Sequence, residues 1–313
     1  MNTGRIRLIL LLSGALCMPL SAASASDSRD CNRGCLLDIA SAYMDSMSAN
    51  DPAGAPLAAH VRSTENGQPT ELSAGIWATA HGWRYRHTFV DPVSGSIGAL
   101  GVVSEGTDQD AMVGLRLKVE SRKIVESELL VTRKGDFSLF QPRASIEPRA
   151  VFNDSIAKDR RATRAELAEI PRHYFDAIRD GNPDLVPVHP DANRVENGVQ
   201  TTNNADFGAS ASLHEGLRRL IYMHTARALR VPVIDADNGL ALAIVAVDMP
   251  QMTRTLLIRG KPVEINPERQ HLPRTLFLFE LFKVEDGQVR EIEAVMRNMT
   301  LGADMGWAVA AAH

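Results

Sequence analysis

Glu65-Asn66-Gly67 and Glu196-Asn197-Gly198 are the same tripeptide, and they stand 131 residues apart (196 − 65). Tyr43 stands 22 residues before the first glutamate (65 − 43). Tyr174 stands 22 residues before the second (196 − 174). A period of this length is that of an ordinary domain and far exceeds a solenoid repeat. The sequence therefore predicts two related domains in tandem.

A second pair of matching segments follows the tripeptides in the same order. Asp91-Pro92-Val93-Ser94-Gly95 in the first half corresponds to Asp235-Ala236-Asp237-Asn238-Gly239 in the second. Asp and Asn accept left-handed backbone geometry, and Gly supplies a positive φ. Each segment is therefore predicted to be the turn of a β-hairpin.

The first residues have the pattern of an export signal. Arg5 and Arg7 precede an apolar run from Leu8 to Leu20, and Ala23-Ser24-Ala25 has the small residues that a signal peptidase requires. The run is short for a bilayer, and no later apolar run approaches spanning length. We expect a signal peptide over residues 1–25 and an exported protein, periplasmic or secreted, without a stable membrane anchor.

Two cysteines remain after the signal is removed, Cys31 and Cys35. Exported cysteine pairs are mostly structural disulfides, so a short-range disulfide at the start of the first helix is favoured. A metal site would need more ligands nearby. A redox role is less favoured, because three residues separate the cysteines and no thioredoxin-like pattern follows.

Composition limits the classes of partner. The chain has 34 Lys and Arg against 38 Asp and Glu, and 44% of its residues are hydrophobic, enough for two packed cores. The longest basic cluster, Lys158-Asp159-Arg160-Arg161, falls between the halves and is best interpreted as a solvated connection. No basic stripe with interleaved aromatic residues appears, so a nucleic-acid partner is not expected.

Each half is predicted to begin with helices. Apolar residues recur at helical spacing from Leu36 to Met47 and from Leu167 to Ile178. A second helical passage is expected from Leu72 to Thr79 in the first half and from Leu213 to Leu229 in the second.

Strands follow the helices in each half. Three β-type runs are predicted in each, at Ile97–Val103, Met112–Val119 and Ile124–Thr132, and at Leu240–Val247, Thr275–Val284 and Val289–Met296. Helices followed by antiparallel strands predict an α+β class, with the helices packed on a curved sheet. Glu126 and Glu128, and their counterparts Glu291 and Glu293, recur at even spacing, which favours a solvated outer face of each sheet.

The order of these elements, with Arg116-Leu117-Lys118-Val119 and Ile124-Val125-Glu126-Ser127-Glu128 closing the first half, resembles the nuclear-transport-factor-2-like superfamily in its SnoaL-like branch. The resemblance implies two tandem cone-shaped α+β barrels. We expect a first domain over residues 26–145, a linker over 146–163, a second domain over 164–300 and a tail over 301–313. Because relatives pair through their sheets, the resemblance also implies an internal pseudo-dimer or a homodimer.

Members of that superfamily hold small molecules in the mouth of the cone, and the enzymes among them need no metal or cofactor. The resemblance implies Glu65 as a base and Tyr43 as a phenol donor, with Glu196 and Tyr174 as their counterparts. A desolvated Glu would have a pKa closer to neutrality and so become an effective base. The alternative is structural: Glu-Asn-Gly is a turn in both halves, with Glu capping backbone N–H groups.

Histidines and aromatic residues supply further candidates. His87 with Asp91 could form a base oriented by a carboxylate, although an exposed His beside a turn is the commoner arrangement. Residues near them or in the equivalent part of the second half are candidate ligand contacts: Trp77, Trp83, Tyr85, His214, Tyr222 and His224.

The segment from Met249 to Pro273 has no counterpart in the first half. Such long insertions often serve as lids or binding loops, and this one would cover one cone or pack the halves together.

Two functions follow from the sequence. One is a cofactor-free acid/base enzyme, a lyase, dehydratase or isomerase acting on a small, largely apolar organic molecule. The other is an exported module that binds such a molecule or a protein without catalysis. A filled cone whose polar groups satisfy one another would favour the second.

Overall fold

The computed structural model describes residues 1, 31–107, 109–144, 147–154, 156–207, 211–220, 225–250, 255–258, 261–264 and 273–307. Apart from residue 1, the predicted signal peptide lies outside them. No helix within these ranges is long and apolar enough to cross a membrane.

The first half contains one long helix and a six-stranded sheet. Its helices and strands are α1 (Arg33–Ser48), β1 (Leu57–Glu65), β2 (Gln68–Pro69), α2 (Ile76–Thr79), β3 (Trp83–Asp91), β4 (Ser96–Ser104), β5 (Asp110–Glu120) and β6 (Lys123–Thr132). The connection to the second half carries α3 (Ala150–Asn153). Short 3₁₀ turns lie at Pro52–Gly54, Pro142–Ala144 and Lys158–Arg160.

The second half repeats this order with one addition. Its elements are α4 (Arg164–Asp180), β7 (Val188–Glu196), β8 (Val199–Gln200), α5 (Leu213–Leu217), β9 (Thr225–Asp235), β10 (Leu240–Met249), β13 (Arg274–Glu285) and β14 (Gln288–Met299). Short 3₁₀ turns lie at Pro183–Leu185, Ala205–Phe207 and Arg218–Leu220. The added hairpin, β11 (Thr255–Ile258) with β12 (Lys261–Glu264), falls in the insertion between Met249 and Pro273.

The two sheets have the same topology. Their strand orders are β2-β1-β6-β5-β4-β3 and β8-β7-β14-β13-β10-β9. In each sheet the first long strand is parallel to the last, and the remaining pairs are antiparallel. The predicted tandem α+β class is confirmed, with mixed sheets that are not closed into barrels.

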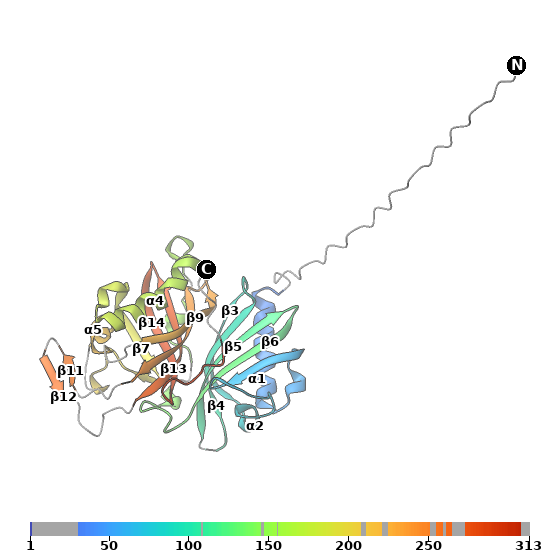
Figure 1. The fold of residues 1–313 in the computed structure, drawn as a ribbon, viewed down its shortest axis with the longest axis horizontal. Coiled ribbons are helices and arrows are strands. Elements are labelled where there is room, and N and C mark those ends of the chain that lie inside the picture. The colour runs from blue at the N-terminus through green and yellow to red at the C-terminus, as the bar shows by residue number, and fades with distance from the viewer. Residues whose placement is uncertain are drawn as a thin grey trace.

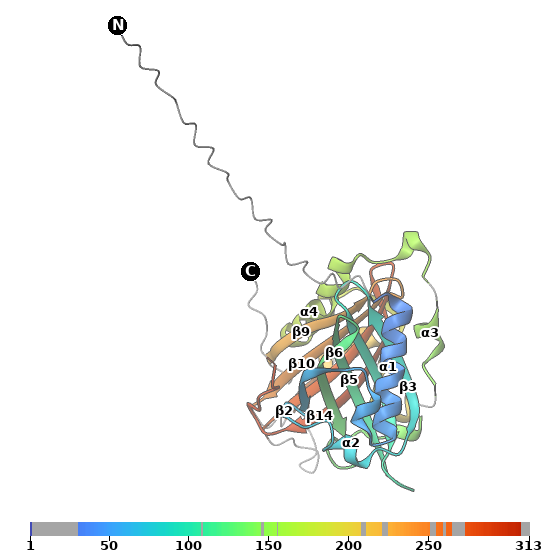
Figure 2. The same cartoon turned by 90° about the vertical axis from the view of Figure 1, so that its right-hand side faces the viewer.

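The two sheets pack against each other, and a long helix lies on the outer face of each. Figure 1 shows the halves side by side, and Figure 2 shows α1 on the face of its sheet that is turned away from the second half. Each helix and the outer face of the sheet beneath it form one core, and a third core fills the space between the sheets. Side chains from both sheets meet in this third core, among them Phe89, Leu100, Leu242 and Phe279.

Two expectations from the sequence are wrong. The helix predicted over Leu213–Leu229 ends within α5 and a 3₁₀ turn at Leu220, because the chain from Thr225 pairs with β10 and this long-range pairing overrides the local helical spacing. The predicted solvated face is the one that packs on the other sheet, so Glu128, Glu291 and Glu293 are buried.

Candidate functional site

The Glu-Asn-Gly tripeptide forms the same turn in both halves. Asn66 and Gly67 have φ values of 53° and 79°, and Asn197 and Gly198 have 46° and 80°. Two successive positive φ values are those of a type I′ hairpin turn, here between β1 and β2 and between β7 and β8. This geometry agrees with the structural alternative, in which Glu-Asn-Gly is a turn in both halves. The catalytic role of the glutamates stays a prediction.

The asparagine of each turn joins the first strand of the sheet to the last. The Asn66 side-chain oxygen accepts a hydrogen bond from the Val131 N–H at 2.8 Å, and that of Asn197 accepts one from the Met296 N–H at 2.9 Å. The Asn197 amide also donates to the Met296 carbonyl at 2.8 Å and to the Leu139 carbonyl at 3.1 Å. The repeated Asn therefore holds the sheet together.

In the first half, Glu65 and Tyr43 have partners within the protein. Glu65 Oε2 accepts a hydrogen bond from the Ile76 N–H at 2.8 Å, at the start of α2. Burial raises the pKa of Glu65, and this hydrogen bond partly opposes the rise. Tyr43 Oη lies 2.7 Å from Ser127 Oγ and accepts a hydrogen bond from Trp77 Nε1 at 3.1 Å. Burial raises the pKa of Tyr43 to about 12.

Around Tyr43, buried aromatic side chains of the first half pack together. Tyr43 and Trp77 pack edge to face with ring centroids 5.0 Å apart, and both side chains are buried. Two clefts lined by described residues have volumes of about 720 Å³ and about 600 Å³. Neither is lined by Tyr43, Glu65, His87 or Asp91, nor by Tyr174 or its neighbours in the second half.

The second half places a charged cluster at the corresponding position. Tyr174 lies on α4, and its hydroxyl accepts a hydrogen bond from Arg194 Nη1 at 3.0 Å. Arg194 Nε lies 3.1 Å from Glu196 Oε1. All three side chains are largely removed from solvent. Burial would lower the pKa of Arg194, but Glu196 and Tyr174 outweigh it, so the guanidinium stays charged.

Glu280 on β13 completes this cluster. Burial raises the pKa of Glu280 to about 8, against the opposing charge of Arg194 and a hydrogen bond with Tyr174. Its Oε2 atom has no hydrogen-bond partner among the described residues. Two other buried carboxyl oxygens also lack a hydrogen bond, Glu128 Oε2 and Glu291 Oε1, but an arginine nitrogen lies 3.8 Å from the first and 2.7 Å from the second.

The register of the sheets identifies the counterpart of Glu280 in the first half. Glu196 pairs with Ala294, and Ala294 pairs with Glu280. In the first half, Glu65 pairs with Leu129, and Leu129 pairs with Leu115. Leu115 therefore occupies the position of Glu280, and the two halves differ in chemistry at the same place in the fold.

His87 and Asp91 do not form the expected dyad. His87 Nδ1 lies 3.0 Å from Glu293 Oε2, and the same carboxylate accepts from the Tyr85 hydroxyl at 2.8 Å. This group is buried between the two sheets, and burial, with the Glu293 charge, raises the pKa of Tyr85. Asp91 binds Arg164 through both oxygens, at 2.8 and 2.6 Å. Among the described residues, His87 and Asp91 are not hydrogen-bonded to each other.

The remaining candidates lie apart from the cluster of the second half. Trp83 Nε1 donates to the Met44 carbonyl at 3.1 Å on the first half. His214 is partly exposed, and its Nε2 lies 2.8 Å from Asp184 Oδ1. Tyr222 and His224 lie outside the described residues. Their roles as ligand contacts stay predictions.

Glu280 and Arg194 were missed by sequence reasoning. The signal for Glu280 was available, because it is a lone charge within the apolar run Leu276-Phe277-Leu278-Phe279-Glu280-Leu281-Phe282. A charged residue in a strand that is apolar on both faces is buried and needs a partner. Arg194 has no such signal, because it stands in a polar segment.

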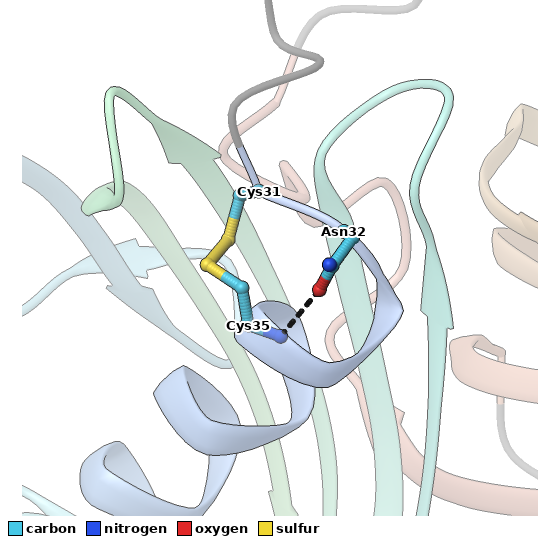
Figure 3. Close-up of a disulfide and its surroundings, with 3 residues drawn as sticks. All are labelled: Cys31, Asn32 and Cys35. Atoms are coloured by element: carbon cyan, nitrogen blue, oxygen red, sulfur yellow. Dashed lines mark hydrogen bonds between the residues drawn. A yellow bond between two sulfur atoms is a disulfide. The ribbon is translucent and has the colours of Figure 1, made fainter.

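The predicted disulfide between Cys31 and Cys35 is present. Figure 3 shows it at the first turn of α1, where the Asn32 side chain accepts a hydrogen bond from the Cys35 N–H at 3.0 Å. The disulfide and the Asn32 cap therefore act on the same turn of the helix. Such a bond is compatible with an exported protein.

Within the described ranges, no group of three or more His, Cys, Asp or Glu side chains is arranged to hold a metal ion.

Comparison with known proteins identifies a family and two similar structures. No curated protein matches the chain. A solved protein from Caulobacter vibrioides, described as uncharacterized with a cystatin-like fold, is 16% identical over 42% of this chain and 85% of its own, with a TM-score of 0.28. A protein from Cytophaga hutchinsonii described as NTF2-like is 14% identical over 43% of this chain and 98% of its own, with a TM-score of 0.26.

The family model matches in two segments, residues 29–130 and 160–296. One segment covers the helix and sheet of each half, which agrees with the tandem copies predicted from the repeat. The chain belongs to the family described as "Domain of unknown function (DUF8021)".

Proposed function

We propose that this protein is an exported, cofactor-independent acid/base protein whose second half binds a small, largely apolar organic molecule and exchanges a proton with it through Glu280. The reaction class would be that of a lyase, dehydratase or isomerase. The first half would serve as the structural partner of the second.

The observation that carries this proposal is the Oε2 atom of Glu280, which is buried without a hydrogen-bond partner among the described residues. A buried polar atom without a partner costs roughly 1–3 kcal/mol. A ligand hydroxyl or N–H group at this oxygen would recover that cost. Leu115 stands at the equivalent place in the first half, so the fold itself does not require a carboxyl group here.

The neighbours of Glu280 suit proton exchange. With a pKa of about 8, its carboxyl group is present in both protonation states near neutral pH, which is where a general acid or base works best. Arg194 donates to the Tyr174 oxygen, which leaves the Tyr174 proton available for a carboxylate or a ligand oxygen. A buried donor of this kind stabilises negative charge that develops on a carbonyl oxygen during proton abstraction.

The first half lacks these properties at the equivalent place. Tyr43 is satisfied by Ser127 and Trp77, and Glu65 caps the N–H of Ile76. Groups that satisfy one another within a filled interior have a structural role more often than a catalytic one. This contrast favours the second half as the functional one.

The test is a screen of the mature protein against small apolar carbonyl and phenolic compounds, by thermal shift and then by product analysis. We expect at least one compound to bind and to be converted, and Glu280→Gln to abolish conversion while the protein remains folded. Glu291→Gln is the matched control, because Glu291 is also a buried carboxyl with a pKa raised by burial, to about 7, but it faces Arg149.

Binding that requires Glu280 without any conversion would support the alternative, a non-catalytic binding module. Equal binding and conversion by the Glu280→Gln variant and the parent protein would rule out the proposed role of this residue.

A further inference from the structure

We propose that the protein has a second ligand site, in the cleft of about 720 Å³ between the β4–β5 end of the first sheet and the segment that leads to the second half, and that this cleft binds a small organic anion with an apolar body. Its polar lining comes from both sides of the cleft: Glu105, Asp110, Arg133, Lys134 and Arg143. This site shares no lining residue with the Glu280 cluster.

Both carboxylates in the cleft are already neutralised by arginines. Glu105 accepts hydrogen bonds from Arg133 Nε at 2.6 Å and Arg133 Nη2 at 2.7 Å. Asp110 accepts one from Arg84 Nε at 2.7 Å and one from Arg143 Nε at 2.9 Å. Burial alone would raise both pKa values, but these hydrogen bonds and charges hold them below the ordinary range. The two carboxylates therefore stay ionised and occupied.

The cleft is lined by more cationic than anionic side chains. Three cationic side chains line the cleft, Arg133, Lys134 and Arg143, against two carboxylates, Glu105 and Asp110. Lys134 is exposed, and among the described residues its ammonium group has no hydrogen-bond or ion-pair partner. A concave surface with surplus positive charge concentrates anions. The charge of the cleft therefore selects an anionic ligand.

The segment opposite the sheet also supplies apolar side chains. Phe140, Pro142 and Ala144 line the cleft, and Phe140 also packs against the core between the sheets. A few charged groups beside apolar side chains are the usual composition of a small-molecule site. An inorganic anion would leave these side chains in water, so a ligand with an aromatic or alkyl body matches the cleft better.

The segment that carries these apolar side chains is held in place by the second half. The Gln141 N–H donates to the Asn197 carbonyl at 2.9 Å, and the Asn197 amide donates to the Leu139 carbonyl at 3.1 Å. A Cβ atom on Gly198 would lie 2.2 Å from the Gln141 carbonyl oxygen, so this close approach requires a glycine there. The cleft is therefore formed before any ligand arrives, which lowers the entropic cost of binding.

The experiment is isothermal titration calorimetry of the mature protein with benzoate and with phenyl phosphate. The comparison of these two compounds shows whether the cleft prefers a carboxylate or a phosphate ester. Benzyl alcohol and inorganic phosphate are the controls that lack the charge or the apolar body. Lys134→Glu is the test variant. Lys123→Glu is the matched control, because it makes the same charge change at the other, exposed end of β6.

We expect one or both aromatic anions to bind one to one, with an affinity that falls as salt is added. Lys134→Glu should weaken binding by roughly tenfold or more, since a charge-assisted contact is stronger than a neutral one. Lys123→Glu should leave the affinity unchanged.

The proposal is overturned if neither aromatic anion binds, if a control compound binds as tightly, or if the two variants behave alike. Each result is independent of the Glu280→Gln experiment, because Lys134 does not contact the Glu280 cluster.

Discussion

Arg164 of the second half donates to both carboxylate oxygens of Asp91 of the first half, at 2.8 and 2.6 Å. The same relationship exists in the opposite direction, because Arg33 donates to both oxygens of Asp235, at 2.8 and 2.5 Å. Each arginine is the first residue of a long helix, and each aspartate begins one of the two matching hairpin turns. The halves are therefore joined by two equivalent ion pairs.

Arg164→Ala is expected to destabilise the protein by roughly 2–4 kcal/mol, because it leaves the buried carboxylate of Asp91 without its cation. Urea unfolding followed by circular dichroism measures this loss. Arg33→Ala should have a similar effect through Asp235. Arg172→Ala is the control, since Arg172 pairs with Glu169 on the exposed face of α4, and it should change stability little.

The effect of Arg164→Ala should also depend on pH. Burial would raise the pKa of Asp91, but hydrogen bonds from Arg164 and Ser94 and the Arg164 charge hold it below 3.8. A lowered carboxyl pKa contributes stability above the unfolded value, and this contribution is lost as the pH falls through the folded value. The difference between variant and parent should therefore be largest above pH 4 and shrink below it. A difference independent of pH would contradict this account.

Glu280→Leu is expected to stabilise the protein at alkaline pH, because leucine is the residue that the first half has at this place. The folded pKa of about 8 lies above the reference value of 4.5, so the parent protein loses stability as the pH rises between these values. The loss is at most roughly 5 kcal/mol, since one pKa unit corresponds to about 1.4 kcal/mol.

Urea unfolding of the parent and Glu280→Leu at several pH values from 5 to 9 measures this difference. The slope of the parent should be larger than that of the variant. Glu291→Gln separates the contribution of Glu291, whose pKa is raised to about 7 and which titrates within the same range. Parallel slopes for parent and Glu280→Leu would contradict the buried, raised pKa of Glu280.

Asn197→Ala should lower the free energy of unfolding by roughly 2–3 kcal/mol. The substitution removes buried hydrogen bonds to β14, and it places alanine at a positive φ, which alanine adopts less readily than asparagine or glycine. Asn197→Gly keeps the backbone conformation and removes only the hydrogen bonds. It should therefore be less damaging, and thermal unfolding of the two variants measures the difference. Equal loss in both would mean that the left-handed backbone contributes nothing.

Trp307→Ala should weaken the attachment of the C-terminal segment to the first half. Two guanidinium groups contact the Trp307 ring, with the Arg62 and Arg116 Cζ atoms 3.9 and 4.8 Å from its centroid. The Trp307 Nε1 donates a hydrogen bond to Thr64 Oγ1 at 2.8 Å. We expect a loss of roughly 3 kcal/mol in urea unfolding.

Trp307→Phe is the matched variant for this contact. It keeps an aromatic ring beside the two arginines but cannot donate to Thr64, so it should lose roughly 1 kcal/mol. If Trp307→Ala and the parent protein unfold at the same urea concentration, the segment does not stabilise the first half.

Local signals accounted for much of the fold. The helical spacing of Leu36 to Met47 and the positive-φ residues of the Glu-Asn-Gly turns act within a few residues, so they can be recognised without knowledge of the rest of the chain. The same signals failed over Thr225–Leu229, where pairing with a distant strand decides the conformation. They also failed to predict the burial of Glu293, because that depends on which face of the sheet the other half covers.

By itself, the sequence determined the tandem repeat, because the same residues recur at the same spacing in both halves. It also determined the α+β class, the turns and the short disulfide, because these depend on spacing within one half. Only the tertiary structure decided that Asp91 faces Arg164 rather than His87, and that Glu280 lies beside Tyr174. These partners are 73 and more than 100 residues apart (164 − 91; 280 − 174). Contacts of this kind arise when two complete sheets and their helices pack together, and no local pattern encodes them.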